Sequence, residues 1–478
     1  MIGRKEESEL LKSLLKTKES QFVAVFGRRR IGKTFLIREA FENNFTFQHT
    51  GLSNVSIPDI SQKQAQLDKF SESLSEYGFR PSEKITSWNQ AFNGLKEIIK
   101  ASKQRKKVIF IDELSWMDTR DCGLISALEN FWNGWATARK EKDVVLVICA
   151  SATYWVIDKI VNSKGGLHNR LTQQINLKPF TLKECEEYLS EMKIKFNRHQ
   201  ILQCYMALGG VPYYWSLLQK GKSLAQNLDR LFFSDGAILE NEYDNLYRAL
   251  FTQPEQYLEI IEALSSVNKG LTRDELAVKS KINTSGDFSK KLRELENCGF
   301  IRKYLPYGQK NNGLYQLVDN YTIFYQKFLK HKTTDEQFWE HQHASPAVMS
   351  WCGIAFERVC LEHIKQIKAA LGISGVYTEA FSWKCKANAD KGLYGSQIDL
   401  LIVRKDQIIN LCEMKYSESE YTVDSKFDKQ MRCKMHDFAT TSKTKYAIHP
   451  VLVTTYGVMK NSYADNLQAV ITADELFR

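Results

Sequence analysis

Three apolar runs in the first 180 residues set the pattern of the chain. QFVAVF (21–26), VIFI (108–111) and VVLVIC (144–149) are each about as long as a buried strand. KTFLIREAF (33–41), which follows the first run, instead spaces its apolar residues as one face of a helix does. Parallel strands buried on both faces are continuous apolar runs, whereas half-exposed strands alternate. The pattern therefore predicts an α/β fold with a parallel sheet.

A different order of elements is predicted between residues 250 and 332. Leu258, Ile261 and Leu264 mark the apolar face of a first helix, and Thr272 caps a second helix with an acidic first turn. SGDFSKKLRELENCGF (285–300) predicts a third helix, and two short strands surround the polar tip PYGQKNNG (306–313). Three helices and a hairpin are the order of a winged helix-turn-helix.

Residues 340–478 are expected to form a further α/β domain around a hairpin. Its strands are QIDLLIV (397–403) and IINLCEMKY (408–416). Asp399 lies on the first strand, and Glu413 and Lys415 lie two apart on the second, hence on one face. Two carboxylates can bind a divalent metal, and an amine beside them can polarise or deprotonate a water that attacks phosphate.

Length and composition bound these expectations. At 478 residues the chain is too long for one ordinary core, and 43% hydrophobic with 26% charged residues is the composition of a folded protein. We expect four parts: 1–180, 181–249, 250–332 and 340–478. The start is charged, and no stretch approaches the roughly 18 apolar residues of a membrane span. These features predict a cytoplasmic protein with no membrane partner.

The formal net charge of +10 permits a polyanionic partner without requiring one. Between Lys281 and Lys310 there are seven basic and three acidic residues. The basic ones are 281, 290, 291, 293, 302, 303 and 310, and the acidic ones are 287, 294 and 296. This excess favours contact with DNA phosphates, although such a unit also occurs as a plain packing module.

A glycine turn between the first strand and its helix carries the clearest chemistry. Gly27, four further residues and Gly32-Lys33-Thr34 fit the phosphate-binding pattern G-x-x-x-x-G-K-[ST]. Backbone N–H groups of such a loop surround the phosphates of ATP, Lys33 reaches the β/γ oxygens and Thr34 binds Mg²⁺. Asp112 and Glu113 follow the second strand, where Asp112 is expected to hold Mg²⁺ and Glu113 to orient and deprotonate the attacking water.

Several segments together resemble one family. MIGRKEE, GRRRIGKT, VIFIDEL, the strand end ICASATYW and R-x₆-L-x-P-F are similar to the archaeal-ATPase family of AAA+ ATPases of the STAND type, over roughly residues 1–225. The resemblance implies further ATP/ADP-binding residues and a helical lid at 181–249. The implied residues are Ile2, Gly3 and Arg4 beside the adenine, Arg28, Arg29, Arg30 and Ile31 in the glycine loop, Ser151 as first sensor, Arg170 as arginine finger or phosphate sensor, and Gly210 and Pro212 of the lid.

Two of these implications leave alternatives open. Arg170 is equally consistent with a surface salt bridge, and an arginine finger acting in trans would require a homo-oligomer. The lid has no clear second-sensor arginine, so a slow switch is as consistent with the sequence as a fast motor.

The C-terminal D-x₁₃-E-x-K arrangement resembles the PD-(D/E)XK restriction-endonuclease-like superfamily. The resemblance implies Glu357, Asp399 and Glu413 as ligands of a second Mg²⁺ or Mn²⁺, Lys415 as a catalytic amine, and a helix beginning near Lys426. Gln397-Ile398 departs from the pattern, where proline often stands. We therefore expect a Mg²⁺-dependent ATPase that couples nucleotide state to DNA binding and cleavage. The alternative is a STAND-type switch whose C-terminal domain binds nucleic acid or protein without cutting it.

Overall fold

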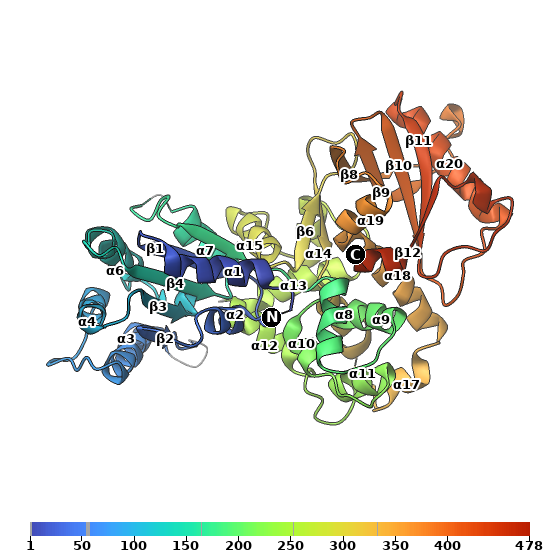
Figure 1. Cartoon of the computed structure of the whole chain (residues 1–478). Coiled ribbons are helices and arrows are strands. Elements are labelled where there is room, and N and C mark those ends of the chain that lie inside the picture. The colour runs from blue at the N-terminus through green and yellow to red at the C-terminus, as the bar shows by residue number, and fades with distance from the viewer. Residues whose placement is uncertain (1, 54–57, 164, 252, 332) are drawn as a thin grey trace. The chain divides into compact units, whose positions relative to one another are not determined.

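The computed structural model describes residues 2–53, 58–163, 165–251, 253–331 and 333–478, and the chain forms two compact units. The first unit contains Met1–Pro179, Asp244–Pro254 and Arg293–Cys298. The second contains Phe180–Tyr243, Glu255–Leu292 and Gly299–Arg478. The chain passes between them five times: after Pro179, within α12 (Glu242–Leu250), after Pro254, within α15 (Gly286–Asn297) and after Cys298. Figure 1 labels both helices.

A five-stranded parallel sheet forms the centre of the first unit, as the apolar runs predict. Its strand order is β2-β3-β4-β1-β5. The strands are β1 (Gln21–Phe26), β2 (Phe47–Thr50), β3 (Lys107–Asp112), β4 (Val144–Ala150) and β5 (Gln173–Asn176). All four pairings are parallel, so the carboxyl ends of all five strands lie along the same edge.

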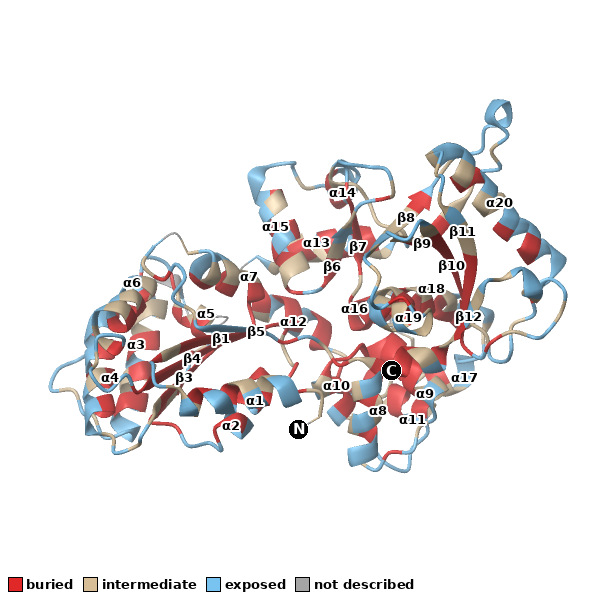
Figure 2. Cartoon of the chain, turned by 45° about the horizontal axis from the view of Figure 1, so that its top comes forward, coloured by how far each residue is buried: buried red, intermediate tan, exposed pale blue. Residues whose placement is uncertain are grey.

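Successive residues of the central strands enter opposite layers of core. Phe22 and Ala24 of β1 belong to one apolar cluster, and Val23 and Val25 belong to the other. Figure 2 shows β1, β3 and β4 as buried strands between helices. The helices of this part are α1 (Lys5–Ser13), α2 (Lys33–Ala40), α3 (Asp59–Glu76), α4 (Trp88–Ala101), α5 (Leu114–Met117), α6 (Leu124–Phe131) and α7 (Thr153–Val156).

The second unit begins with helices and includes the predicted order of three helices and a hairpin. Its first helices are α8 (Leu182–Glu191), α9 (Arg198–Leu208), α10 (Pro212–Ser216) and α11 (Leu224–Phe232). The predicted segment contains α13 (Pro254–Ser265), α14 (Arg273–Ser280), α15 and the antiparallel strands β6 (Ile301–Tyr304) and β7 (Leu314–Leu317). Thr272 caps α14 in a reciprocal capping box with Glu275, as the sequence predicts.

A second five-stranded sheet has the order β12-β11-β10-β9-β8. Its strands are β8 (Thr378–Lys384), β9 (Gln397–Arg404), β10 (Ile408–Lys415), β11 (Ala447–Thr454) and β12 (Ala469–Thr472). The remaining helices are α16 (Asn320–Phe324), α17 (Phe338–Gln342), α18 (Pro346–Glu362), α19 (Ile364–Ala370) and α20 (Ser425–Ser442). The predicted hairpin is β9 and β10, which pair antiparallel, and the predicted polar helix is α20.

No helix among the described residues is long and apolar enough to cross a membrane.

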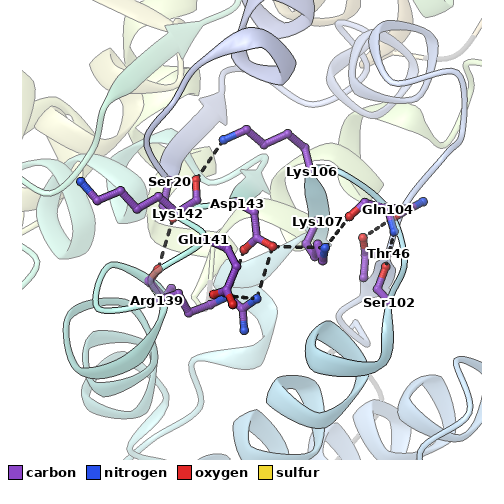
Figure 3. A network of polar contacts seen from close by, with 11 residues as sticks. Ser20, Thr46, Ser102, Gln104, Lys106, Lys107, Arg139, Glu141, Lys142 and Asp143 are labelled. Atoms are coloured by element: carbon purple, nitrogen blue, oxygen red, sulfur yellow. Dashed lines mark hydrogen bonds and ion pairs between the residues drawn. The ribbon is translucent and has the colours of Figure 1, made fainter.

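A buried ion-pair network lies where β3 and β4 begin (Figure 3). The carboxylate of Asp143 accepts from Lys107 Nζ at 3.1 Å and from Arg139 Nε at 3.0 Å. Burial raises the pKa of Asp143, but the two cations lower that pKa more, so the net shift is downward. The carboxylate is therefore stabilised by the folded structure, and it ties the helical segment before β4 to the start of β3.

Asp143→Asn is predicted to lower the free energy of unfolding by about 2–4 kcal/mol at pH 7, because two largely buried cations lose their anion. Urea unfolding of the full chain measures this difference. The folded pKa of Asp143 lies below its ordinary value of 3.8, so its contribution is complete above that pH and is lost as the pH falls through the folded pKa.

Glu141→Gln is the matched control, because Glu141 pairs with the same Arg139 from a side chain that is 61% exposed. We expect its effect to stay below about 0.5 kcal/mol. Equal effects of the two substitutions would contradict a structural role for buried Asp143.

Candidate functional site

The turn between β1 and α2 requires glycine at its two fixed positions. Gly27 has φ +145°, and an added Cβ would lie 2.4 Å from the Leu177 carbonyl oxygen. Gly32 has φ +86° and precedes the first residue of α2. Such a left-handed backbone favours glycine. The phosphate-binding motif therefore has the strand, loop and helix context that it requires.

Lys33 is buried at this turn, with 5% exposure. Its ammonium donates to the carbonyl oxygens of Gly27 and Arg28 at 3.1 and 3.0 Å, and to Ser151 Oγ at 3.0 Å. Three oxygen acceptors satisfy the three donors of a lysine. The cation is thus fixed over the glycine loop and linked to the end of β4.

The predicted magnesium ligands lie together. Thr34 Oγ1 donates to Asp112 Oδ2 at 2.8 Å, joining the first turn of α2 to the carboxyl end of β3. The other carboxylate oxygen, Asp112 Oδ1, accepts from the backbone N–H of Glu113 at 3.0 Å. A hydroxyl and a carboxylate are hard oxygen donors of the kind that Mg²⁺ binds.

Glu113 lies in the left-handed region, with φ +49°, immediately before α5. Its carboxylate accepts from the backbone N–H of Ser151 at 3.1 Å and from Ser151 Oγ at 2.5 Å. Ser151 therefore contacts both Glu113 and Lys33. The predicted sensor, catalytic carboxylate and phosphate-binding lysine form one hydrogen-bonded group.

The residues at the start of the chain and in the variable part of the loop have mixed surroundings. Arg4 is buried and donates to the Lys178 carbonyl at 2.7 Å, beside partly buried Ile2 and Gly3. Ile31 is a core residue, with 1% exposure.

The three loop arginines differ from one another. Arg28 is buried, Arg29 lies with its guanidinium carbon 6.0 Å from the Trp116 ring centre, and Arg30 has φ +70°. A contact of these arginines with nucleotide stays a prediction.

Arg170 and the two lid residues are not joined to this group by any described contact. Arg170 is exposed and lies before β5, without an ion pair among the described residues. Gly210 belongs to the second unit, where an added Cβ would lie 1.9 Å from the Phe180 carbonyl oxygen. Pro212 begins α10. Packing within the second unit accounts for both residues, and their predicted approach to nucleotide stays a prediction.

The four predicted C-terminal residues come from three elements of the second unit. Glu357 lies on α18, Asp399 on β9, and Glu413 and Lys415 on β10. Pairing of the hairpin ends at Cys412 and Leu400, so Glu413 and Asp399 are the next residues on adjacent strands. The three carboxylates line one pocket of about 540 Å³.

Lysines pair with two of these carboxylates. Lys415 and Lys434 donate to the two oxygens of Glu413 at 2.9 and 2.6 Å. Lys269, from the loop between α13 and α14, pairs with Asp399, which also accepts from Gln397 Nε2 at 2.9 Å. The signal for Glu413 and Lys415 was local. Lys269 comes from a segment that the sequence motif does not include, and Lys434 lies on the predicted helix α20 but was not among the predicted site residues.

Two of the four predicted residues, Glu357 and Lys415, have raised pKa values. Burial, and then the negative charge of Asp399, raise the pKa of Glu357 to about 7. Burial lowers the pKa of Lys415, but Glu413 raises it more, so the net shift is upward. Lys415 is consequently a stable ammonium at neutral pH, suited to stabilising negative charge rather than to removing a proton.

Within the described residues, no group of three or more His, Cys, Asp and Glu side chains is arranged to hold a metal ion. The pocket instead has lysines on Asp399 and Glu413. The predicted C-terminal metal site stays a prediction.

The comparisons with known proteins cover residues 1–218 in the family match and more than two thirds of the chain in the others. Residues 1–218 match the model of a family described as an ATPase domain predominantly from Archaea. An uncharacterized protein of Methanocaldococcus jannaschii, MJECL04, is 22% identical over 424 residues, which cover 87% of this chain and 88% of that protein.

Two solved structures are similar at low identity. The Walker-type ATPase PABY2304 of Pyrococcus abyssi is 17% identical with a TM-score of 0.47, covering 69% of this chain and 96% of its own. The ORC2 protein of Aeropyrum pernix is 12% identical with a TM-score of 0.41, covering 68% of this chain and 93% of its own.

Residues 1–218, which match the family model, include Lys33 and its contact with Ser151. This part of the chain is similar to an ATPase domain found predominantly in Archaea.

Proposed function

We propose that the protein is a Mg²⁺-dependent ATPase whose nucleotide state controls DNA engagement by its C-terminal half. One observation carries the first part of the proposal: Lys33, Ser151 and Glu113 form a continuous hydrogen-bonded group at the carboxyl ends of β3 and β4. Ligands of open α/β sheets bind at this edge. The family match of residues 1–218 supports nucleotide binding and hydrolysis there.

The chain's residues divide the chemistry among them. Lys33 supplies positive charge to the phosphates, while Thr34 and Asp112 supply oxygen ligands for Mg²⁺. Bound Mg²⁺ neutralises charge on the phosphate oxygens. Glu113 is the general base and orients the attacking water, and Ser151 fixes the direction of its carboxylate.

Lys33→Ala is predicted to weaken ATP binding by at least about 100-fold, because the loop loses its buried cation. Arg38→Ala is the matched control, since Arg38 is an exposed cation on the same helix and is expected to change affinity less than about twofold. Isothermal titration with ATP and Mg²⁺ measures both. Normal affinity in the Lys33 variant would refute the assignment of the site.

The second part of the proposal concerns phosphodiester hydrolysis in the pocket of Glu357, Asp399 and Glu413. Its carboxylates are hard donors that fit Mg²⁺ or Mn²⁺. Burial and then repulsion by Asp399 raise the pKa of Glu357, and a bound cation would offset that repulsion. Lys415, a stable ammonium, would stabilise the negative charge of the transition state. A bound metal ion would lower the pKa of a water molecule at this site.

The charge excess from Lys281 to Lys310 supports binding of the DNA backbone by the segment containing α14, α15 and the β6–β7 hairpin. We propose that this segment is a winged helix that presents DNA to the pocket. Lys269, at its first loop, pairs with Asp399, which links the segment to the pocket within one unit.

A second candidate is a nucleotide switch whose C-terminal pocket binds without cutting. Asp399 and Glu413 already have lysine partners, and this observation favours it. Carboxylates held by protein cations need no metal to offset their charge. The two candidates share the ATP site and differ only in whether the pocket hydrolyses a phosphodiester.

Cleavage of labelled linear, branched and supercoiled DNA with Mg²⁺ or Mn²⁺, with and without ATP, separates the candidates. We expect cleavage by the wild-type chain and loss of at least about 100-fold in Asp399→Asn, because a proposed metal ligand is neutralised. Asp406→Asn is the matched control, an aspartate paired with Arg404 at the turn of the same hairpin. Absence of cleavage in all conditions, with ATP turnover intact, would favour the switch.

Glu357→Gln is predicted to stabilise the protein at pH 8 by about 1–3 kcal/mol in the presence of a chelator. The folded pKa is about 7 and the ordinary value is 4.5, so the folded state binds more protons between them and stability falls as the pH rises. Below pH 4.5 both states are protonated and the difference disappears.

Thermal unfolding across pH 4 to 8 tests this sign, with exposed Glu379→Gln on β8 as the control. A lower melting temperature of Glu357→Gln than of the wild-type chain at pH 8 would show that the ionised carboxylate is stabilised instead.

A further inference from the structure

A second cavity of the second unit, about 350 Å³ in volume, lies next to the carboxylate pocket. Lys269, Glu357, Gln397 and Asp399 line both. The β6–β7 hairpin forms one side and α18 with β8 and β9 another, as Figures 1 and 2 allow the reader to follow. A backbone bridge between Pro306 and Ser382 holds these segments together.

Arg358 of α18 is the unusual member of the lining. It is 6% exposed, and its Nε has no hydrogen-bond partner among the described residues. The side chain also forms no ion pair with a described residue. Burial lowers the pKa of Arg358 to about 10, so the guanidinium is still charged at neutral pH. Buried arginines are almost always paired, because an uncompensated buried charge is costly.

A second guanidinium lines the same cavity. Arg302 of β6 donates from Nε to Gln316 Oε1 at 2.9 Å, and its guanidinium carbon lies 5.0 Å from the Tyr304 ring centre. Arg302 repels the charge of Arg358, which lowers the pKa of Arg358 further. Two guanidinium groups that line one cavity form a site for an anion with several acceptor oxygens.

The acidic residues of the lining do not neutralise this pair. Asp399 is paired with Lys269, and Glu275 accepts from Thr272 in the cap of α14. Glu357 and Glu362 attract Arg358, but neither forms an ion pair with it among the described residues. A further cation, Lys384, lines the cavity.

Aromatic and apolar side chains form another part of the wall, beside polar residues such as Gln316 and Ser382. Tyr304, Phe381 and Trp383 line the cavity together with Leu314 and Ile354. Proteins that bind single-stranded nucleic acid use arginines that contact phosphate together with aromatic rings that stack on bases.

The geometry points to a nucleoside-phosphate site here, in which Arg302 and Arg358 bind the phosphate and the aromatic wall contacts the base. The volume fits one nucleotide, either the phosphorylated end of a strand or a free mononucleotide. This inference goes beyond the proposed function, because it requires neither ATP hydrolysis nor cleavage.

Titration calorimetry of the full chain carrying Lys33→Ala, with a chelator, tests the site without binding at the glycine loop. The probes are a 5′-phosphorylated thymidine trinucleotide, the same trinucleotide without phosphate, AMP and inorganic phosphate. We expect the phosphorylated trinucleotide to bind at least about tenfold more tightly than its unphosphorylated form. Binding of AMP without the trinucleotide would identify a free nucleotide as the ligand. Binding of inorganic phosphate alone, or of no probe, would overturn the proposal.

Arg358→Met and Arg302→Gln are each expected to weaken the bound probe at least about tenfold. Lys405→Gln, an exposed cation at the turn between β9 and β10, is the control and should bind as its parent does. Arg358→Met should also raise the melting temperature without ligand, because it removes an unpaired buried charge. Unchanged affinity, or a large fall in melting temperature, would show that Arg358 serves the fold and not a ligand.

Discussion

Parallel pairing of β1 with β4, and of β4 with β3, brings three carboxyl ends to one edge of the sheet. Each strand end delivers a different group there: the glycine loop with Lys33, the acidic pair Asp112 and Glu113, and Ser151. Had one strand run in the opposite direction, its group would lie at the far edge, a strand length away. The hydrogen bonds from Ser151 to Lys33 and Glu113 exist only because of this shared direction.

The same edge explains how much the sequence could predict. The spacing of Gly27, Lys33 and Thr34 and the apolar run before Asp112 are local patterns, and they were sufficient to predict the sheet and the glycine loop. The hairpin of β9 and β10 was predictable for the same reason, because alternating faces and a polar turn are local features. These local patterns do not locate every functional residue, since the nucleotide contacts of Arg170 and Gly210 remain predictions.

Long-range partners were out of reach of such patterns. Lys269 is 130 residues from Asp399 in sequence, and neither residue carries a local sign of the other. Arg358 directly follows Glu357, but the sequence gives no reason to single it out. One more arginine in a basic chain is unremarkable until its burial is known. Burial and the lack of an ion pair with a described residue are properties of the fold, and they place a buried guanidinium in a cavity beside the predicted carboxylates.

Glu113 illustrates a conflict between stability and chemistry at a single backbone position. Its left-handed φ of +49° is one that glycine adopts without the roughly 1 kcal/mol penalty that other residues pay. A glycine there would relax the turn before α5, but it would remove the carboxylate that contacts Ser151. Under the proposed role of Glu113 as general base, selection for a sturdier fold and selection for hydrolysis oppose each other at this residue. Under that proposal, variants that only bind nucleotide would be free to lose the carboxylate first.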